Sequence, residues 1–479
     1  MTDLPDETSV PSGLEDVAEE VARRFDHTVN RLKDLVEVPS ISFAGHDRET
    51  VRRSAELTER HLEAAGLKEV RRLELGDVHP YVYGEWLEAG EDAPTVLLYA
   101  HHDVQPVGTP DNWTSPPFEP TERDGRLYGR GAADDKAGIM VHVAAVEAWL
   151  RTRETLPVNV KVIIEGEEEI GSPHLTEFLH AYRELLDADV IVLTDLTNWK
   201  VGWPGLTYSL RGMGELYVTL RALEQPVHSG MWGGPIPDAL TGLTRLLACL
   251  HDDQGRPAVP GFHDDVRGPS QRERELIGAL GDDADAIREE AGVLDGVAWT
   301  GDPDLGLWER IWLQPAITVI GIDAPSVRDA SNQLVAEARA KISLRFAPGQ
   351  DPDRGLRLVE EHLRAHVPWG MQLHTEVGAR NPAWVTDPEG PAFDAAMAAM
   401  TAAYGRAPAL IGCGGSIPFV KPFSDAFGGA PCLLTGVEDP RTNAHGEDES
   451  LHLGDFLKAC LSEALLFEEL AGRADLLRR

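Results

Sequence analysis

The spacing of apolar residues predicts alternating helices and strands along the first part of the chain. Apolar positions recur at helical spacing over 16–36, 61–66, 138–150 and 173–186. Short, continuous apolar runs predict buried strands over 95–100, 158–164 and 188–194. Strands that alternate with helices in this way are typical of an α/β fold with a mainly parallel central sheet.

The pattern changes after about Arg211. Residues 214–222 and 336–349 alternate apolar and polar positions, which predicts half-exposed strands, and helices are expected over 236–250 and 354–367. Residues 251–310 are rich in Asp, Gly and Pro and carry no clean periodicity. The α/β pattern returns after Pro391. We therefore expect a catalytic α/β domain over 14–210, a smaller α+β domain over 211–380 that interrupts it, and the rest of the first domain over 381–479.

The net charge of the chain argues against some classes of binding partner. It has 479 residues, 44 Lys and Arg, 80 Asp and Glu, and a net charge of −36. This balance argues against nucleic acid and against an anionic membrane surface, because both are bound by clustered basic side chains. The four cysteines lie far apart without a C-x-x-C pair, and the start of the chain has no apolar signal segment. We expect a cytoplasmic protein.

Acidic residues follow the ends of three predicted strands. The strand over 95–100 leads into His101 and Asp103, the strand over 158–164 into the acidic run 165–169, and the third ends at Asp195. Parallel α/β sheets bind ligands outside the carboxyl ends of their strands, so these side chains are expected to meet at one edge. Asp134 precedes another predicted helix.

Carboxylates gathered in this way repel one another, and divalent cations resolve the conflict. Imidazoles from His101 and His445 shift the preference from Ca²⁺ or Mg²⁺ toward Zn²⁺, with Mn²⁺ or Co²⁺ as alternatives. Two Zn²⁺ ions balance the charges of Asp134, Glu169, Asp195 and one hydroxide. The chain contains no H-E-x-x-H, G-x-S-x-G or G-x-x-x-x-G-K-[ST] motif, which removes three rival enzyme classes.

Eight motifs in a fixed order identify a family resemblance. They are LLYAHHDVQP, GRGAADDKAG, IIEGEEEIGS, VLTD, HSGMWGG, ISLRFAPGQDP, GGSIP and NAHGEDES. This series resembles the dinuclear zinc aminoacylase and dipeptidase family, and within it the carnosine dipeptidases and cytosolic non-specific dipeptidases. The resemblance spans about Val38 to Leu453. It implies a catalytic α/β domain with an inserted lid and dimerisation domain.

The resemblance also implies a metal-ligand set. His101 and Asp195 would bind one metal ion, Glu169 and His445 would bind the other, and Asp134 would bridge both. In this family the peptide bond between the bridging Asp and the next residue is typically cis.

Two further acids of the site have implied roles in catalysis. Asp103 would hydrogen-bond His101 and fix its tautomer. Glu168 would be the general base that takes a proton from the nucleophilic water and passes it to the leaving amine. His102, which lies between two functional residues, is interpreted as structural.

The lid supplies the implied substrate contacts. His228 would stabilise the oxyanion in the active site of the partner subunit, and Arg345 would bind the carboxylate of the substrate. Three more residues are candidates for substrate contacts: Gly415, Ser416 and Asn332. Carnosine-dipeptidase-like relatives usually carry a histidine where the lid returns, and this chain has Ala379 and Arg380 there.

The sequence thus favours a homodimeric, dinuclear zinc dipeptidase that cleaves dipeptides or short peptides with a metal-activated hydroxide. One alternative is an N-acyl amino acid amidohydrolase of the deacetylase or desuccinylase type. The other is a non-catalytic binding or assembly protein on the same fold, against which the presence of Glu168 argues.

Overall fold

The chain is described by a computed structural model that covers residues 4–5, 7–281, 283–417 and 419–477. It divides into two compact units. The first contains the described residues of 1–208, 387–411 and 418–479, and the second contains 209–386 and 412–417. The segment 412–417 therefore joins the second unit although it follows the return of the chain to the first.

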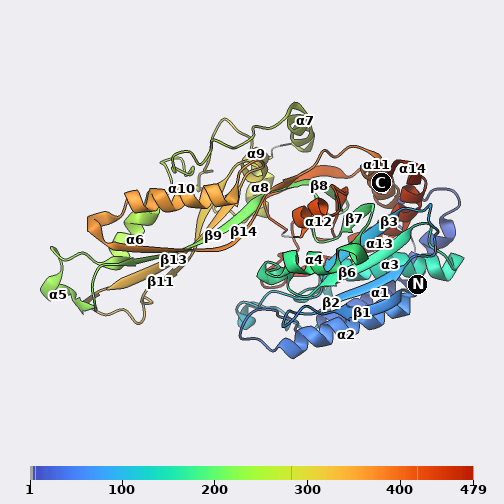
Figure 1. Ribbon diagram of the computed structural model, residues 1–479, viewed down its shortest axis with the longest axis horizontal. Coiled ribbons are helices and arrows are strands. Elements are labelled where there is room, and N and C mark those ends of the chain that lie inside the picture. Colours follow the sequence, from blue (N-terminus) through green and yellow to red (C-terminus); the bar gives the residue numbers. More distant parts are fainter. Residues whose placement is uncertain (1–3, 6, 282, 418, 478–479) are drawn as a thin grey trace. The chain divides into compact units, whose positions relative to one another are not determined.

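Most strands of a nine-stranded sheet form the centre of the first unit (Figure 1), and its last strand, β15, belongs to the second. Its order is β1-β2-β6-β3-β7-β17-β8-β15, and β16 pairs with β8. The central strands β6, β3, β7 and β17 are parallel, whereas β1, β2, β8 and β15 pair antiparallel at the two sides. The α/β prediction with a mainly parallel central sheet is confirmed. The strands are β1 (Lys68–Leu73), β2 (Tyr81–Trp86), β3 (Thr95–His101), β6 (Asn159–Glu165), β7 (Val190–Leu193), β8 (Gly205–Leu210), β15 (Trp384–Val385), β16 (Ala409–Cys413) and β17 (Cys432–Leu434).

Helices bury both faces of this sheet, which explains why its central strands are apolar throughout. On one face, alternate residues such as Val96, Leu98 and Ala100 join the main core with α1, α3 and α13. On the other face, Tyr81 stacks on Phe178 of α4, and Tyr99 contacts Phe419 just before α12. The helices of this unit are α1 (Glu15–Val36), α2 (Arg48–Ala65), α3 (Lys136–Arg153), α4 (Leu175–Leu186), α11 (Pro391–Tyr404), α12 (Val420–Ala426), α13 (Leu453–Ala471) and α14 (Ala474–Leu477), with the 3-10 turns η1 (Pro110–Asn112) and η2 (Glu168–Ile170).

A small sheet, β18-β5-β4, lies beside the loop that precedes α3. Its strands are β4 (Thr121–Arg123), β5 (Arg126–Tyr128) and β18 (Ser450–His452). Because β18 pairs with β5, this sheet links segments from the two ends of the sequence that both border the site described below. No helix of the described chain combines the length and apolar character required to cross a membrane.

The second unit is built on the four-stranded antiparallel sheet β11-β13-β9-β14. The strands are β9 (Gly212–Arg221), β11 (Ala316–Asp323), β13 (Glu337–Phe346) and β14 (Gln372–Asn381), with a two-stranded ribbon of β10 (Val227–His228) and β12 (Gln333–Leu334). Alternate residues of β9 and β13 form a core with α6 and α10, and the intervening residues stay half-exposed on the other face. The helices are α5 (Ser229–Trp232), α6 (Ala239–Ala248), α7 (Gln271–Leu280), α8 (Ala284–Glu290), α9 (Leu307–Leu313) and α10 (Pro352–Ala365), with the 3-10 turn η3 (Pro368–Gly370).

Two expectations from apolar spacing can be completed from the structure. The helical spacing over 61–66 is the last part of a longer helix, α2, which ends at Gly66 as expected and begins at Arg48, because Asp47 caps its start by accepting a hydrogen bond from the amide of Glu49. The segment 251–310, in which no regular element is expected, contains the short helices α7, α8 and α9. Each is too short to show a clear apolar period, and the starts of α7 and α8 are fixed by Ser270 and Asp283 as capping residues.

Candidate metal centre

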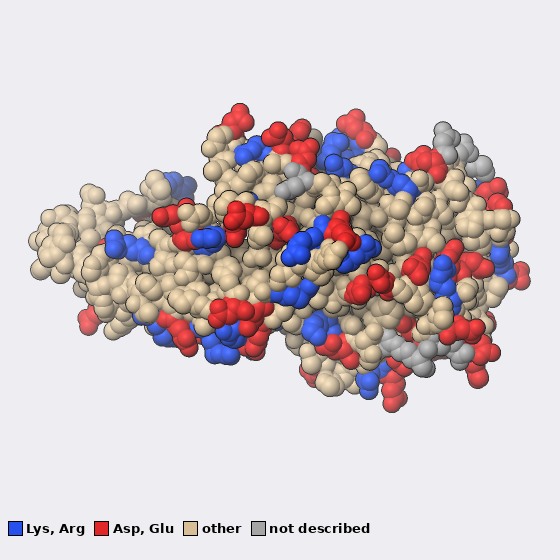
Figure 2. All heavy atoms as spheres, turned by 90° about the horizontal axis from the view of Figure 1, so that it is seen from above, with Lys and Arg blue, Asp and Glu red and all other residues tan. Residues whose placement is uncertain are grey.

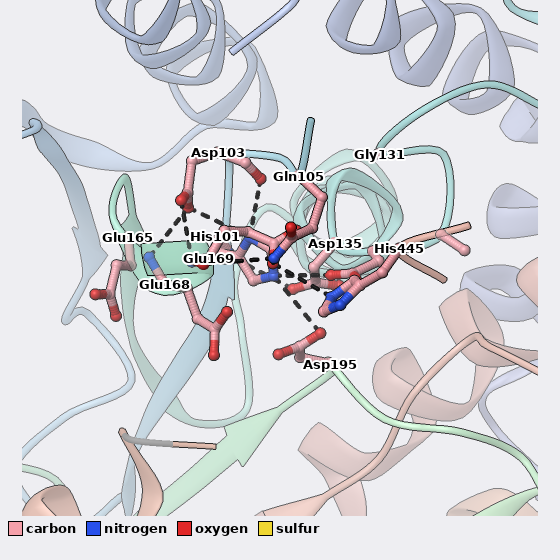
Figure 3. A network of polar contacts seen from close by, with 12 residues as sticks. His101, Asp103, Gln105, Gly131, Asp135, Glu165, Glu168, Glu169, Asp195 and His445 are labelled. Atoms are coloured by element: carbon pink, nitrogen blue, oxygen red, sulfur yellow. Dashed lines mark hydrogen bonds and ion pairs between the residues drawn. The ribbon is translucent and has the colours of Figure 1, made fainter. Parts of the chain in front are cut away.

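The five predicted metal ligands meet at the carboxyl ends of the central strands. Figure 3 labels His101, Glu169, Asp195 and His445 among them. His101 ends β3, Asp195 follows β7, and Glu169 lies in η2 directly after β6. Asp134 precedes α3, and His445 lies in the loop between β17 and β18. The structure therefore brings together residues that are up to 344 positions apart in the sequence, as the topology of a parallel sheet predicts.

Asp134 lies between the two histidines. Its Oδ1 is 3.0 Å from Nε2 of His101, and its Oδ2 is 3.0 Å from Nε2 of His445. His101 Nε2 is also 3.6 Å from Oδ1 of Asp195, and His445 Nε2 is 3.3 Å from Oε2 of Glu169. The two oxygens of one carboxylate thus face two separate sets of ligand atoms.

Each set contains three groups whose ligand atoms lie within 4.8 Å of one another. One set is Asp134, Glu169 and His445, and the other is His101, Asp135 and Asp195. The peptide bond between Asp134 and Asp135 is cis, as the resemblance implies. Asp135 had no predicted role; its Oδ2 accepts a hydrogen bond from the amide of His101 at 3.2 Å.

Asp103 organises the backbone around the cluster. Its Oδ1 accepts from the amide of Glu168 at 3.2 Å, and its Oδ2 accepts from the amide of Glu169 at 3.1 Å and from Oγ of Ser42 at 2.7 Å. His101 Nδ1 is 3.0 Å from the backbone carbonyl of Asp103 and 3.5 Å from its carboxylate. The backbone oxygen therefore makes the closer contact at Nδ1 and holds the ring with Nε2 facing Asp134, and the carboxylate of Asp103 mainly holds η2.

Two side chains of η2 point into the site. Glu169 accepts a hydrogen bond from Nε2 of Gln105 at 2.7 Å. Glu168 carries a carboxyl group whose pKa is raised well above its usual range, first by burial and then by its acidic neighbours, including Asp195. A carboxyl group with a raised pKa can accept and release a proton near neutral pH.

The charges of the ligand atoms oppose one another strongly. Burial raises the pKa of Asp195, and it raises the pKa of Glu169 to about 7. Burial alone would lower the pKa of His445, but hydrogen bonds to Asp134 and Glu169 raise it to about 11. In this state the imidazoles hold protons that compensate the carboxylates, and divalent cations would compensate them instead.

A buried acid, Glu449, holds the loop of Asp134 and was not predicted from the sequence. Glu449 accepts hydrogen bonds from the amides of Gly131, Ala133 and Asp134 at 3.1, 3.0 and 3.2 Å. It also accepts one from Arg130 at 2.6 Å, and Arg130 donates in turn to the carbonyl of Gly446, next to His445. Both residues lie in quoted motifs, GRGAAD and GEDES, but nothing in the sequence separates a buried acid from the exposed acids beside it.

Glu438 is a second acid that the sequence did not identify. Burial, followed by the charges of Asp134 and Asp195, raises the pKa of Glu438 well above its usual range. Its backbone pairs with the segment after Asp195, because the amide of Asn198 donates to the carbonyl of Glu438 at 2.7 Å. The raised pKa favours the neutral form of this carboxyl group beside the cluster.

In the second unit, His228 and Asn332 lie side by side. His228 pairs with Gln333 in the β10–β12 ribbon, and the carbonyl of Asn332 accepts from the amide of Ser229 at 2.9 Å. His228 is exposed, and its Nδ1 accepts from the amide of Gly230 at 3.1 Å. This bond places the proton of the neutral ring on Nε2, which leaves Nε2 as a hydrogen-bond donor.

Arg345 lies on the half-exposed face of β13, near the segment 412–417 that carries Gly415 and Ser416. Burial lowers the pKa of Arg345, and the charge of Cys413 partly offsets this effect. Nε of Arg211 donates to the carbonyl of Gly414 at 3.0 Å and holds this segment beside the start of β9. Burial and then the positive charge of Arg345 lower the pKa of Arg211 to about 10. The structure thus brings Arg345 near the loop of Gly415 and Ser416.

Two remaining positions have structural contacts. His102 is fully buried with Nε2 2.9 Å from the carbonyl of Pro80, and burial lowers the pKa of its ring to about 4. Arg380, at the place of the missing lid histidine, forms an ion pair of 2.5 Å with Asp353 at the start of α10.

Known proteins are similar to this chain in sequence and in fold. Residues 97–469 match the sequence profile of Peptidase family M20/M25/M40. The chain is 39% identical to the cysteinylglycine-S-conjugate dipeptidase of Corynebacterium striatum over 375 residues, which are 78% of this chain and 80% of that protein. It is 29% identical to the Cys-Gly metallodipeptidase dug1 of Schizosaccharomyces pombe over 476 residues, which are 96% of this chain and 98% of that protein. The crystal structure of human carnosine dipeptidase 1 superposes with a TM-score of 0.85 at 26% identity and covers 96% of this chain and 99% of that one. These matches confirm the resemblance that the eight motifs indicate, and the chain belongs to peptidase family M20/M25/M40.

Proposed function

We propose that this protein is a dinuclear metal-dependent dipeptidase that hydrolyses the peptide bond of unblocked dipeptides or short peptides. The observation that carries the proposal is the position of Asp134, whose two carboxylate oxygens each lie 3.0 Å from a different histidine. The relatives named above are dipeptidases, which supports the same substrate class.

The donor set fits two zinc ions. His101 and Asp195 would hold one, Glu169 and His445 the other, and Asp134 both. The set contains imidazole nitrogens and carboxylate oxygens, which suit Zn²⁺, with Mn²⁺ and Co²⁺ as alternatives. Asp134, Glu169 and Asp195 bring three negative charges, which two dications with a hydroxide would neutralise. When bound, such ions lower the pKa of a water molecule toward neutrality and polarise the scissile carbonyl.

Glu168 would move the proton. Its carboxylate would take a proton from the nucleophilic water and deliver it to the nitrogen of the leaving amine. Asp103 fixes the backbone amides of Glu168 and Glu169 together, so one residue positions both the general base and a metal ligand.

Arg345 would bind the free carboxylate of the substrate. A guanidinium group forms two parallel hydrogen bonds to a carboxylate, and the loop with Gly415 and Ser416 would add polar contacts at the same end. Arg345 and the 412–417 segment belong to the same compact unit, which supports this pairing.

A homodimer would supply the oxyanion donor. Arg345 pairs with Met213 near the start of β9, whereas His228 lies beyond Arg221 at the other end of that strand. Eight residues of extended chain span about 26 Å, and a dipeptide spans only about 7 Å. One substrate would therefore meet Arg345 of one protomer and the partner subunit's His228, whose Nε2 is set up as a donor.

The edge strand β11 supports such a pairing. It lies at the outside of the four-stranded sheet and exposes Ile320 and Ile322. The end of the second unit that carries α5, here called the tip, exposes Met231, Trp232 and Val327. The tip that carries α5 shows few charged side chains in the view of Figure 2. We propose that a second copy covers this apolar edge, because a monomer rarely leaves one exposed.

The described cysteines form no disulfide, which supports a reducing compartment such as the cytoplasm.

The test is a pair of measurements on purified enzyme loaded with Zn²⁺, Mn²⁺ or Co²⁺. Glu168→Gln should lower kcat by roughly 10²–10⁴-fold at unchanged metal content, since it keeps the shape and loses the base. Glu177→Gln, an exposed acid on α4, serves as the matched control and should keep full activity. Near-normal hydrolysis by Glu168→Gln with metal bound would refute the general-base assignment.

A substrate panel tests the specificity. Dipeptides with a free carboxylate should be cleaved in preference to their C-terminal amides and to N-acetyl amino acids. Arg345→Met should raise KM for the free dipeptides and leave the amides unaffected. A preference for N-acetyl amino acids would indicate the amidohydrolase alternative instead.

A further inference from the structure

A cluster of one thiol and two imidazoles lies in the second unit, outside the catalytic cluster. Cys249 caps the C-terminal end of α6, His362 lies in the last turn of α10, and His366 caps the end of α10. One possible ligand atom from each lies within 4.8 Å of the other two. The two helices that carry them pack on the same face of the four-stranded sheet.

Backbone carbonyls orient both imidazoles. Nε2 of His362 is 2.9 Å from the carbonyl of Cys249, and Nδ1 of His366 is 2.7 Å from the carbonyl of His362. With the proton on the nitrogen that faces a carbonyl, the other nitrogen of each ring carries a lone pair. Histidines that bind metal ions in proteins are fixed in the same manner. The ring centroids are 4.1 Å apart, so the two rings remain close together.

The electrostatic surroundings favour a cation. All three residues lie at helix C-terminal ends, where the unsatisfied carbonyls make the local potential negative. His362 is buried, Cys249 is half-buried and His366 is exposed, so the cluster opens to solvent on one side. An ion can reach it, and water can complete its coordination.

We propose that Cys249, His362 and His366 form a separate binding site for a zinc-type ion in the second unit. A thiolate with two imidazoles is the ligand set that Zn²⁺ prefers, and a water molecule would supply the fourth tetrahedral position. On binding, the thiol of Cys249 loses its proton to solvent and a bond from sulfur to the metal forms. The ion would cross-link the ends of α6 and α10 and hold them on the sheet.

Cobalt distinguishes this site from the catalytic one. The catalytic cluster offers only nitrogen and oxygen ligands, so Co²⁺ bound there gives no sulfur-to-metal charge-transfer absorption. Titration of the chelator-treated full chain with Co²⁺ should produce such a band in the near ultraviolet, saturating at micromolar Co²⁺. Zn²⁺ added afterwards should abolish it, and the metal content at saturation should be one ion per chain above that of the catalytic site.

Matched variants assign the band. Cys249→Ser should abolish it, and His366→Gln should reduce affinity by at least tenfold, whereas Cys413→Ser and the exposed His263→Gln should leave the band unchanged. His366 lies at the exposed end of α10, so we expect His366→Gln to leave the fold intact. A band that is absent, that survives Cys249→Ser, or that appears only at millimolar Co²⁺ as an adventitious ion would overturn the proposal. The band does not depend on peptide hydrolysis, so its outcome is independent of the catalytic assignment.

Discussion

Single side chains of this protein act mainly through the backbone that they hold. Asp103 is fully buried, and its carboxylate binds two amides and one hydroxyl group. The sequence predicted that Asp103 belongs to the site, because the H-x-D motif follows a buried strand. It could not predict that the carboxylate holds the turn of Glu168 and Glu169, since that contact crosses 65 residues and depends on strand order.

His61 gives a residue-scale prediction about pH. Burial, followed by the positive charges of Arg31 and Arg60, lowers the pKa of His61 to about 4. The unfolded chain binds a proton here below about pH 6.5, whereas the folded chain stays neutral until about pH 4. The free energy of unfolding therefore falls as the pH drops through this window, by up to about 3 kcal/mol from this group.

His61→Leu should remove that contribution. Urea unfolding of the wild type and the variant at pH 7 and pH 4.5 should show a smaller loss of stability for the variant. Effects of metal binding are common to both proteins and cancel in the comparison. The exposed His46→Gln is the control and should follow the wild type; an equal pH dependence of His61→Leu and wild type would contradict the prediction.

At the scale of elements, loops carry the chemistry and strands determine where they meet. The parallel order β6-β3-β7-β17 brings the loops after four strands to one edge. This could be predicted, because apolar runs followed by acids mark the strand ends. The contact between the Asp134 loop and Glu449 could not be predicted, since Glu449 lies more than 300 residues away and follows no apolar run. The helices of 251–310 escaped prediction for a related reason, because capping contacts rather than apolar spacing define them.

Glu449 gives the element-scale prediction. Glu449→Gln keeps the size of the side chain but leaves the buried guanidinium of Arg130 without its charged partner. Breaking a buried ion pair typically costs about 3–5 kcal/mol. The loop that carries Asp134 also loses one of its two acceptor oxygens, because the amide group of Gln has one oxygen and an NH2 group that would face other donors. We expect lower thermal stability together with at least tenfold weaker metal binding, measured by competition with a chelating dye.

Glu447 provides the control in the same loop. Its carboxylate is exposed and accepts from the amide of Thr109 at 3.1 Å. Glu447→Gln should leave metal affinity unchanged. If Glu449→Gln destabilised the fold without weakening metal binding, Glu449 would be structural and would not position Asp134.

At the scale of the whole molecule, most of the acidic residues do not belong to the site. Figure 2 shows Asp and Glu side chains spread over the visible face and interspersed with Lys and Arg. The net charge of −36 indicates little about the substrate, which would meet Arg345 and metal ions instead. The sequence motifs predicted the family, which is confirmed, and a set of ligand positions that stays a prediction, because both rest on local patterns. The proposed assembly would depend on an apolar strand edge and tip whose residues are scattered along the chain, and spacing alone does not reveal them.

The proposed exchange of His228 between subunits gives the whole-molecule prediction. Glu168→Gln and His228→Ala should each be nearly inactive as homodimers, the first for lack of a base and the second for lack of an oxyanion donor worth about 2.7–4 kcal/mol. In a mixed dimer, the protomer with His228→Ala keeps Glu168 and receives the partner subunit's His228. Random exchange makes half of the dimers mixed, each with one complete site of two, so the mixture should recover about a quarter of the wild-type activity.

The experiment requires proof that the two variants have exchanged subunits. The two variants are mixed after dissociation at low protein concentration, and light scattering follows the return of the dimer. Ile322→Lys places a charge on the edge strand β11 and should keep the chain monomeric, so that mixtures carrying it recover no activity. Full activity of a monomer, or no recovery from mixtures proven to contain mixed dimers, would mean that His228 does not act across the interface. A recovery that rises with the fraction of mixed dimers follows only if the active site takes residues from both copies.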